Sequence, residues 1–365
     1  MIPRGYDRKL VLEDGTSVFG RGFGCGGERV FELVFNTSPV GYQEILSDPS
    51  YTDQGVVMAY PLIGNYGIAE DDFESKTPSI AAMIVREYNP EPSNYRSVMD
   101  LEAAMLRFGV AGISEVDTRM LVRHIRDYGS CRAMLTGAGT DAEEAAVRLR
   151  EHALPRDAVS RVSRKAAERC EGGGRFHVVA IDCGMKENIL RSLVKRGCGV
   201  TVVPWNTTAE EIVALAPDGV FVSNGPGDPQ DVPEVIETVG KLRGRLPVFG
   251  ICLGHQILAL SYGARTYKLK FGHRGGNHPV KELATDKIEI TSQNHSYAVD
   301  AESLKGTPLE ATHINLLDGT IEGVECARDR AFGVQYHPES APGPQDSGHL
   351  FDRFAALMEE VKSRA

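Results

Sequence analysis

The second half of the chain alternates between continuous apolar runs and amphipathic stretches. From residue 176 the runs FHVVAID, GVTVVP, DGVFVS and LPVFGI are typical of buried strands. Between and after them, KENILRSLVKRG, TAEEIVALAP, PEVIETVGKLRG and LGHQILALSYG carry apolar residues at helical spacing. This strict alternation predicts an α/β domain with a mostly parallel sheet flanked by helices. After residue 264 the pattern changes to strands and turns, and a final helix is predicted from Leu350 to Val361.

The first 140 residues have a more mixed pattern. KLVLEDGTSVFG alternates on both sides of an Asp-Gly turn, which predicts a β-hairpin. A stripe of apolar residues from Leu101 to Leu106 predicts one helix, and a second helix is expected between Asp117 as its N-cap and Gly129 as its stop. We therefore expect a smaller α+β domain at the N-terminus.

The segment 141–175 differs from both of its neighbours. DAEEAAVRLREHAL predicts a short amphipathic helix, after which apolar content falls and the segment ends in three glycines, 172–174. The sequence thus predicts an N-terminal domain over 1–140, a linker with a short helix over 141–175, and a second domain over 176–365.

Composition narrows the class of protein. The chain has 365 residues, of which 42% are hydrophobic and 25% charged, as in ordinary globular proteins. The net charge is −10, and both predicted domains are net negative, which argues against nucleic acid or an anionic membrane as partner. Seven cysteines without any C-x-x-C spacing disfavour a disulfide framework or a zinc site, so we expect no metal and a cytoplasmic location. No signal sequence and no 18-residue apolar window are found, so no membrane association is expected.

The strongest chemical signal is Gly250-Ile251-Cys252-Leu253-Gly254, where a predicted strand meets a predicted helix. It is the thiol counterpart of the G-x-S-x-G nucleophile elbow. A cysteine at a helix N-terminus is favoured as thiolate, and the backbone N–H of Leu253 is placed to face an oxyanion. From the pentapeptide alone, a buried structural cysteine is the alternative interpretation.

A thiolate nucleophile needs an acid–base partner, and His337 in GVQYHPE is the best candidate among ten histidines. Pro338 favours an extended backbone, which lets Glu339 reach back and orient the imidazole. A surface loop without a role is the alternative. Three other histidines are more typical of packing or loop positions: His255, His273 and His278.

The loop Asn224-Gly225-Pro226-Gly227-Asp228-Pro229 follows the predicted strand DGVFVS. Taken alone it is an ordinary turn. At the carboxyl end of a neighbouring parallel strand, however, it opens into the same crevice as the elbow and can supply a second oxyanion donor. It does not fit the P-loop pattern, and the chain has no other nucleotide-phosphate motif.

Taken in order, GICLGHQ, SNGPGDP and YHPE resemble the class I (triad) glutamine amidotransferases over about residues 176–365. The resemblance extends further, because FNTSPVGYQEILSDPSY, DTR at 117–119, KFGHRGGNHPV and SQNHSYAVD are similar to the small, glutamine-hydrolysing subunits of carbamoyl-phosphate synthases. That family joins an N-terminal domain of its own to an amidotransferase domain, so the resemblance covers nearly the whole chain.

The resemblance implies a mechanism. Cys252 attacks the side-chain amide of L-glutamine, His337 carries the proton to the departing ammonia, and Glu339 holds His337 in the required tautomer. The backbone amides of Leu253 and Gly227 stabilise the oxyanion.

The resemblance also implies a set of glutamine contacts. Besides Gly227 and Leu253, the matching positions are Ser50, Gly225, Gln256, Asn294, Ser296 and Tyr297. Ser50 lies in the N-terminal domain, so a contact there implies a pocket between the domains. Family members often carry Gly-Phe where this chain has Ser296-Tyr297, a change that backbone contacts tolerate unless residue 296 needs a positive φ.

The implied partner is a separate large subunit that binds ATP, Mg²⁺ and bicarbonate, forms a heterodimer with this chain, and makes carbamoyl phosphate for arginine and pyrimidine biosynthesis. No cofactor is expected on this chain. One alternative is an amidotransferase subunit of another synthase, such as anthranilate or aminodeoxychorismate synthase, although those subunits resemble the C-terminal domain alone. A non-catalytic regulatory subunit and a cysteine peptidase are further alternatives. Cys183 is interpreted as a packing residue.

Overall fold

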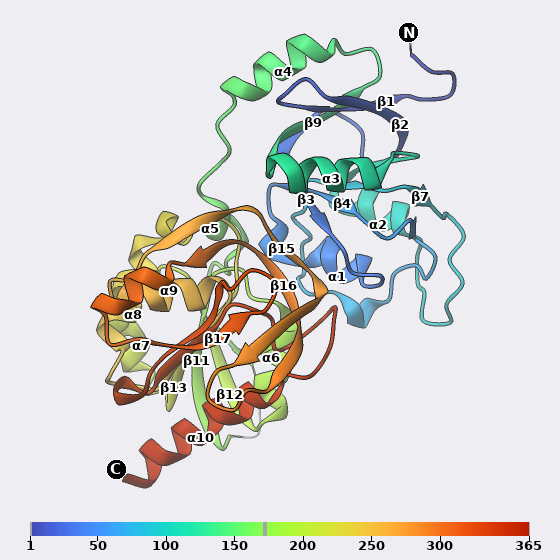
Figure 1. Ribbon diagram of the computed structural model, residues 1–365. Coiled ribbons are helices and arrows are strands. Elements are labelled where there is room, and N and C mark those ends of the chain that lie inside the picture. The colour runs from blue at the N-terminus through green and yellow to red at the C-terminus, as the bar shows by residue number, and fades with distance from the viewer. Residues whose placement is uncertain (1, 171–173, 365) are drawn as a thin grey trace. The chain divides into compact units, whose positions relative to one another are not determined.

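The computed structural model describes residues 2–170 and 174–364, and the chain divides into two units, Met1–Pro155 and Arg156–Ala365 (Figure 1). The segment predicted as a linker is shared between these units. Helix α4 (Ala142–Glu151) packs on the strands of the first unit, whereas α5 (Ala158–Val162) contributes Val159 to the core of the second. The predicted glycine boundary at residues 172 and 173 lies outside the described residues.

A closed β-barrel forms the centre of the first unit. In its described part, seven strands close in the order β1-β2-β8-β6-β4-β3-β9. Their bounds are β1 Arg8–Leu12, β2 Ser17–Gly24, β3 Arg29–Asn36, β4 Gln54–Met58, β6 Ala82–Ile84, β8 Ala111–Ser114 and β9 Cys131–Gly137. The predicted hairpin around Asp14-Gly15 is confirmed, since β1 and β2 pair antiparallel. The closure was not predicted, because it depends on pairings between distant segments, such as parallel β4 and β6.

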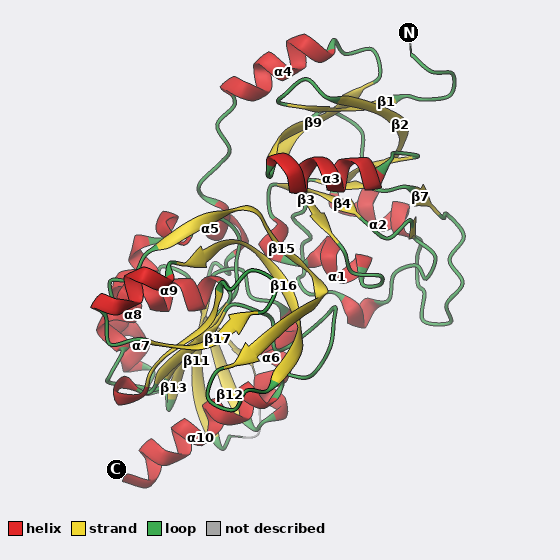
Figure 2. Ribbon diagram, in the orientation of Figure 1, coloured by secondary structure: helices red, strands yellow, loops and turns green. Residues whose placement is uncertain are grey.

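Helices complete the first unit (Figure 2). They are α1 Tyr42–Ser47, α2 Leu101–Phe108 and α3 Thr118–Tyr128, with a short ribbon of β5 Leu62–Ile63 and β7 Glu87–Tyr88. Both predicted ends of α3 are confirmed. Asp117 Oδ1 accepts a hydrogen bond from the Met120 N–H at 3.0 Å, and Gly129 leaves the helix with φ of 105°. The α+β character expected of this unit follows from these helices and the barrel.

The second unit is built on one sheet, which has ten strands in its described part, in the order β10-β12-β11-β13-β14-β19-β18-β16-β15-β17. The five strands from β12 to β19 in that order are parallel, as the alternating pattern predicts. The other strands extend both edges antiparallel. The bounds are β10 Glu168–Cys170, β11 Phe176–Asp182, β12 Cys198–Pro204, β13 Gly219–Val222, β14 Val248–Ile251, β15 Thr266–Glu282, β16 Ile288–Val299, β17 Glu310–Asn315, β18 Ile321–Cys326 and β19 Ala331–Val334.

Helices cover both faces of the parallel strands. Successive residues of a strand point to opposite faces, and in β11 Val178 joins the core under α6 and α10, whereas Val179 joins the core under α5, α7, α8 and α9. The bounds are α6 Glu187–Lys195, α7 Ala209–Ala214, α8 Pro233–Leu242, α9 Leu253–Ser261 and α10 His349–Arg364. This arrangement confirms the predicted α/β class, and it brings the carboxyl ends of β11, β13, β14 and β19 to one edge.

None of the helices within 2–170 and 174–364 is both long enough and apolar enough to cross a membrane.

Candidate active site

Cys252 stands at the sharp turn between β14 and α9, with φ of 54° and ψ of −103°. A positive φ is uncommon and strained for a residue with a side chain. The two flanking glycines make the turn possible. A Cβ on Gly254 would lie 2.1 Å from the Val222 carbonyl oxygen, and a Cβ on Gly250 would lie 2.5 Å from the Gly254 carbonyl carbon. Helix α9 therefore approaches the strand ends closely only because residues 250 and 254 have no side chain.

The thiol of Cys252 is buried, with 2% of the residue exposed, beside polar groups of β16 and of Gln335, the residue that follows β19. Its Sγ lies 3.5 Å from the Asn294 carbonyl oxygen and 3.7 Å from Gln335 Nε2, which donates toward the sulfur. The Cys252 N–H donates to the Val334 carbonyl at 2.9 Å and so ties the turn to β19. Leu253 is the first residue of α9, so its N–H has no acceptor within the helix.

His337 and Glu339 form a buried pair at the same sheet edge. His337 Nδ1 lies 2.6 Å from Glu339 Oε1, and the His337 N–H donates to the Ser292 carbonyl at 2.9 Å. Burial by itself lowers the pKa of His337, but the Glu339 carboxylate and the Cys252 thiol outweigh it and raise the pKa to about 10. Because Nδ1 is bound to Glu339, Nε2 is the ring nitrogen left to interact with the Cys252 thiol, and the raised pKa favours a proton on the imidazole over one on the thiol.

Lys186 belongs to this group, although the sequence analysis did not identify it. Its Nζ donates to Glu339 Oε1 at 2.9 Å and to the Ser340 carbonyl at 2.5 Å. Burial raises the pKa of Glu339, but the charges of Lys186 and His337 outweigh it and lower the pKa to about 2. Lys186 follows β11 by four residues, so its position near the carboxyl end of a parallel strand is the signal that identifies it.

A pair of glutamines borders the thiol. Gln256 Nε2 donates to the Tyr297 carbonyl at 2.8 Å and to Gln335 Oε1 at 2.9 Å. The structure thus brings together Cys252, Gln256 and Tyr297 from the predicted set, and adds Gln335, which lies in the GVQYHPE motif but was not singled out.

The loop after β13 packs against the elbow. A Cβ on Gly225 would lie 2.2 Å from the Cys183 carbonyl oxygen and 2.8 Å from a Leu253 methyl group. Gly227 has φ of 88°, a conformation that favours glycine. Cys183 itself is fully buried in the core under α9, and burial raises the pKa of its thiol, which agrees with a packing role.

Two further residues were predicted to contact glutamine, Ser296 in the second unit and Ser50 in the first. Ser296 is not among the residues with positive φ, and its Oγ accepts a hydrogen bond from Arg274 Nη2 at 2.5 Å, so serine fits this position without strain. Ser50 is in the first unit, in a 3₁₀ turn (Pro49–Tyr51), where its N–H donates to Asp48 Oδ1 at 2.9 Å. Its contact with glutamine stays a prediction.

The fold of the second unit and its cysteine elbow define a class I glutamine amidotransferase domain, and residues 179–357 match the family model described as glutamine amidotransferase class-I. Residues 10–135 match the model described as carbamoyl-phosphate synthase small chain, CPSase domain. The chain belongs to the family of carbamoyl phosphate synthase small chains, which confirms the resemblance found in the sequence.

Curated relatives agree along the whole length. The carbamoyl phosphate synthase small chain of Bacillus caldolyticus is 54% identical over 98% of this chain and 98% of its own. That of Fusobacterium nucleatum is 52% identical over 96% of this chain and 97% of its own. The carbamoyl phosphate synthase pyrimidine-specific small chain of Bacillus subtilis is 52% identical over 97% of each.

Proposed function

We propose that this chain hydrolyses L-glutamine to glutamate and ammonia at Cys252, as the glutaminase subunit of a carbamoyl phosphate synthase. One observation carries the proposal. A cysteine on a strained strand-to-helix turn shares a sheet edge with a histidine whose Nδ1 is bound at 2.6 Å by a carboxylate. This is the arrangement of nucleophile, base and orienting acid that acyl transfer from an amide requires.

The reaction proceeds in two steps. Cys252 Sγ attacks the side-chain amide carbon of glutamine while His337 Nε2 takes the thiol proton. The same proton then goes to the leaving nitrogen, which departs as ammonia and leaves a glutamyl thioester. Water, deprotonated by His337, attacks the thioester and releases glutamate and the thiol. Glu339 stabilises the imidazolium in both steps, and its carboxylate stays ionised because Lys186 lies beside it.

The oxyanion of each tetrahedral intermediate needs hydrogen-bond donors. The backbone N–H groups of Leu253 and Gly227 are the proposed donors, since one begins α9 and the other lies in the loop that packs on it. Loss of one such donor typically costs about 3–4 kcal/mol of transition-state stabilisation. Gly225, Gln256, Asn294, Ser296, Tyr297 and, from the first unit, Ser50 are the proposed contacts of the glutamine itself.

The ammonia is consumed on another chain. We propose a large subunit that binds ATP, Mg²⁺ and bicarbonate, because this sequence carries no phosphate-binding motif and its relatives are named small chains, one of them pyrimidine-specific. The product would serve pyrimidine and arginine biosynthesis. Free cysteines throughout the described residues support a reducing, cytoplasmic location.

The test is glutamate release from glutamine by the purified chain, alone and with a carbamoyl phosphate synthase large subunit, ATP and bicarbonate. We expect slow release alone, a sharp rise with the partner, and carbamoyl phosphate as product. Release that is indifferent to the partner would assign the chain to another synthase, and no release in either case would favour a non-catalytic subunit.

A matched pair of cysteine variants tests the nucleophile. Cys252→Ala should abolish glutamate release, whereas Cys183→Ala, which removes the other buried thiol near the carboxyl edge of the sheet, should keep most of it. Appreciable release by Cys252→Ala would show that the nucleophile is assigned wrongly.

A further inference from the structure

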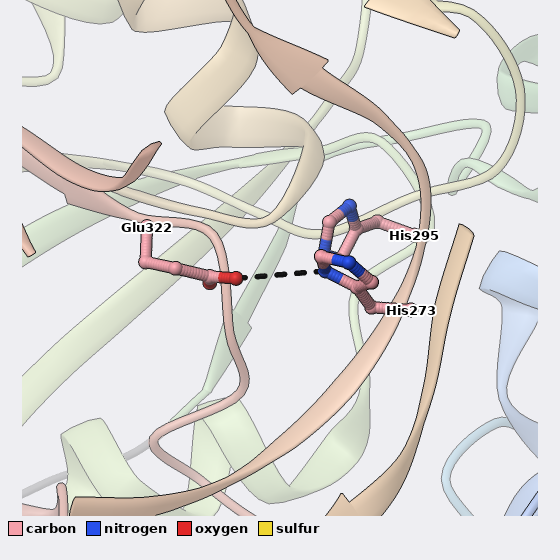
Figure 3. Close-up of side chains that lie close together, drawn as sticks. All are labelled: His273, His295 and Glu322. Carbon is pink, nitrogen blue, oxygen red and sulfur yellow. Dashed lines mark ion pairs between the residues drawn. The ribbon is translucent and has the colours of Figure 1, made fainter. Parts of the chain in front are cut away.

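Three side chains with metal-binding chemistry converge within the antiparallel part of the second sheet, outside the proposed catalytic group. His273 comes from β15, His295 from β16 and Glu322 from β18, and one ligand atom of each lies within 4.8 Å of the others (Figure 3). The three residues are 6%, 5% and 0% exposed, respectively. The sequence shows no ligand spacing here because the residues are 22 and 27 positions apart and meet only through strand pairing.

Each of the two histidines uses one ring nitrogen in a hydrogen bond outside the cluster, which leaves the other ring nitrogen with a free lone pair. His273 Nε2 lies 2.8 Å from the Asp318 carboxylate and donates to it, which leaves Nδ1 as the acceptor nitrogen in the neutral ring. His295 Nδ1 lies 2.7 Å from the Tyr297 carbonyl and donates to it, which leaves Nε2. Within the described residues, neither His273 Nδ1 nor His295 Nε2 has a hydrogen-bond partner.

Glu322 completes the cluster with a fully buried carboxylate. Its Oε1 accepts from Asn315 Nδ2 and its Oε2 from Gln293 Nε2, both at 2.9 Å, so its hydrogen-bond donors are neutral amides. Oε1 also lies 3.6 Å from His273 Nδ1, which is an electrostatic contact but too long for a hydrogen bond. A buried carboxylate that faces a nitrogen lone pair requires a cation between or beside them.

A proton and a metal ion satisfy this requirement to different extents. A proton on His273 Nδ1 would balance the charge of the Glu322 carboxylate, but it would leave His295 Nε2 buried without a hydrogen-bond donor. A single divalent ion would accept electron pairs from all three groups. Each ligand would then be oriented by a second hydrogen bond on its far side, as metal ligands commonly are. These bonds go to the Asp318 carboxylate for His273, to the Tyr297 carbonyl for His295, and to the Asn315 and Gln293 amides for Glu322.

We propose that His273 Nδ1, His295 Nε2 and Glu322 Oε1 bind one divalent transition-metal ion. Two imidazoles and one carboxylate are a ligand set that suits Zn²⁺, and Co²⁺ occupies such sites as a spectroscopic substitute. Arg274 directly follows His273 in the chain and carries a positive charge. Its guanidinium donates hydrogen bonds to the Ser296 hydroxyl and to the Phe271 carbonyl.

The ion would have a structural role close to the thiol. His295 directly follows Asn294, whose carbonyl oxygen lies 3.5 Å from Cys252 Sγ. Binding would therefore fix β16 against β15 and β18 where β16 borders the thiol. The proposal does not depend on glutamine hydrolysis, and its test does not measure it.

The experiment uses the full chain, stripped with a chelator and titrated with Zn²⁺ and with Co²⁺ by calorimetry and elemental analysis. We expect one ion per chain, a visible Co²⁺ band without a thiolate charge-transfer band, and a higher Tm with metal. Glu322→Gln and His273→Asn should bind at least about 100-fold more weakly. His278→Asn is the matched control, because its ring lies 5.3 Å from that of His273 but is not part of the ligand set, and it should bind as the unchanged chain does.

The titration of the unchanged chain decides the question even if a variant does not fold. Absence of saturable binding would overturn the proposal and assign the cluster to a protonated His273. A thiolate band in the Co²⁺ spectrum, or full affinity in a folded Glu322→Gln variant, would also overturn it by placing the ion elsewhere.

Discussion

Lys186 Nζ lies 2.9 Å from Glu339 Oε1, the same carboxylate oxygen that lies 2.6 Å from His337 Nδ1. All three groups are buried, so the carboxylate stands between two cations in a site that water does not screen. The lysine keeps Glu339 ionised. In the proposed mechanism, an ionised Glu339 in turn stabilises the imidazolium that forms when His337 takes a proton from Cys252.

Lys186→Met should therefore weaken both catalysis and stability. Glu339 would lose a charge partner, its pKa would rise, and kcat for glutamine hydrolysis should fall by roughly 10- to 100-fold. Removing one partner of a buried ion pair also costs about 3–5 kcal/mol of unfolding free energy. Lys241→Met, which breaks the exposed pair with Glu237, is the control and should change neither quantity much. Steady-state kinetics and urea unfolding measure both, and equal effects of the two variants would contradict the role given to Lys186.

The stability contributed by His337 should depend on pH in a defined direction. Its pKa rises from 6.5 in the unfolded chain to about 10 in the folded protein, so its contribution is complete below pH 6.5 and is lost as the pH rises toward 10. The difference in unfolding free energy between the unchanged chain and His337→Gln should shrink over this window, by up to about 1.4 kcal/mol per pH unit. Chemical denaturation at pH 6 and pH 9 measures it. A difference that stays constant, or grows with pH, would show that the charged imidazolium is not stabilised in the fold.

The turn at Cys252 should not tolerate a side chain at residue 254. In Gly254→Ala, the Cβ would lie 2.1 Å from the Val222 carbonyl oxygen, which is backbone and cannot move without shifting β13. We expect a loss of about 1–3 kcal/mol or more in unfolding free energy, together with loss of glutamine hydrolysis. Gly240→Ala in α8 is the matched control, because nothing lies within 4 Å of the added Cβ, and it should stabilise the chain by about 0.5–1 kcal/mol. Thermal unfolding and glutaminase kinetics of the two variants provide the comparison, and a fully active Gly254→Ala would refute the packing argument.

Ser296 should matter for stability more than for glutamine binding. Its hydroxyl accepts from Arg274 Nη2, so the proposed contact with glutamine is left to its backbone. Ser296→Gly should keep the KM for glutamine within about twofold while lowering the unfolding free energy by about 1–2 kcal/mol, from the lost hydrogen bond and the added backbone freedom. Ser296→Ala separates these two causes, since it removes only the hydrogen bond. A tenfold rise in KM in either variant would mean that the hydroxyl itself binds the substrate.

Local patterns were sufficient for much of the fold. The strand-helix alternation after residue 176 predicted the parallel sheet, and Asp117 and Gly129 predicted the two ends of α3. These features depend on hydrogen bonds and side chains within a few residues. The barrel of the first unit was not predictable in the same way. Its closure joins strands far apart in the chain, such as β3 and β9, and no local periodicity encodes that pairing.

The candidate site also combines features that depend on neighbouring residues with features that depend on residues far apart in the chain. The turn at Cys252 and the His-Pro-Glu segment are predictable from short stretches of the chain, because each depends on residues within a few positions: two glycines around Cys252, and Pro338 between His337 and Glu339. Only the tertiary structure brought Lys186 to Glu339 and gathered His273, His295 and Glu322. The physical reason is that these residues come from different strands and loops, so their interactions exist only once the sheet has set the order and register of its strands.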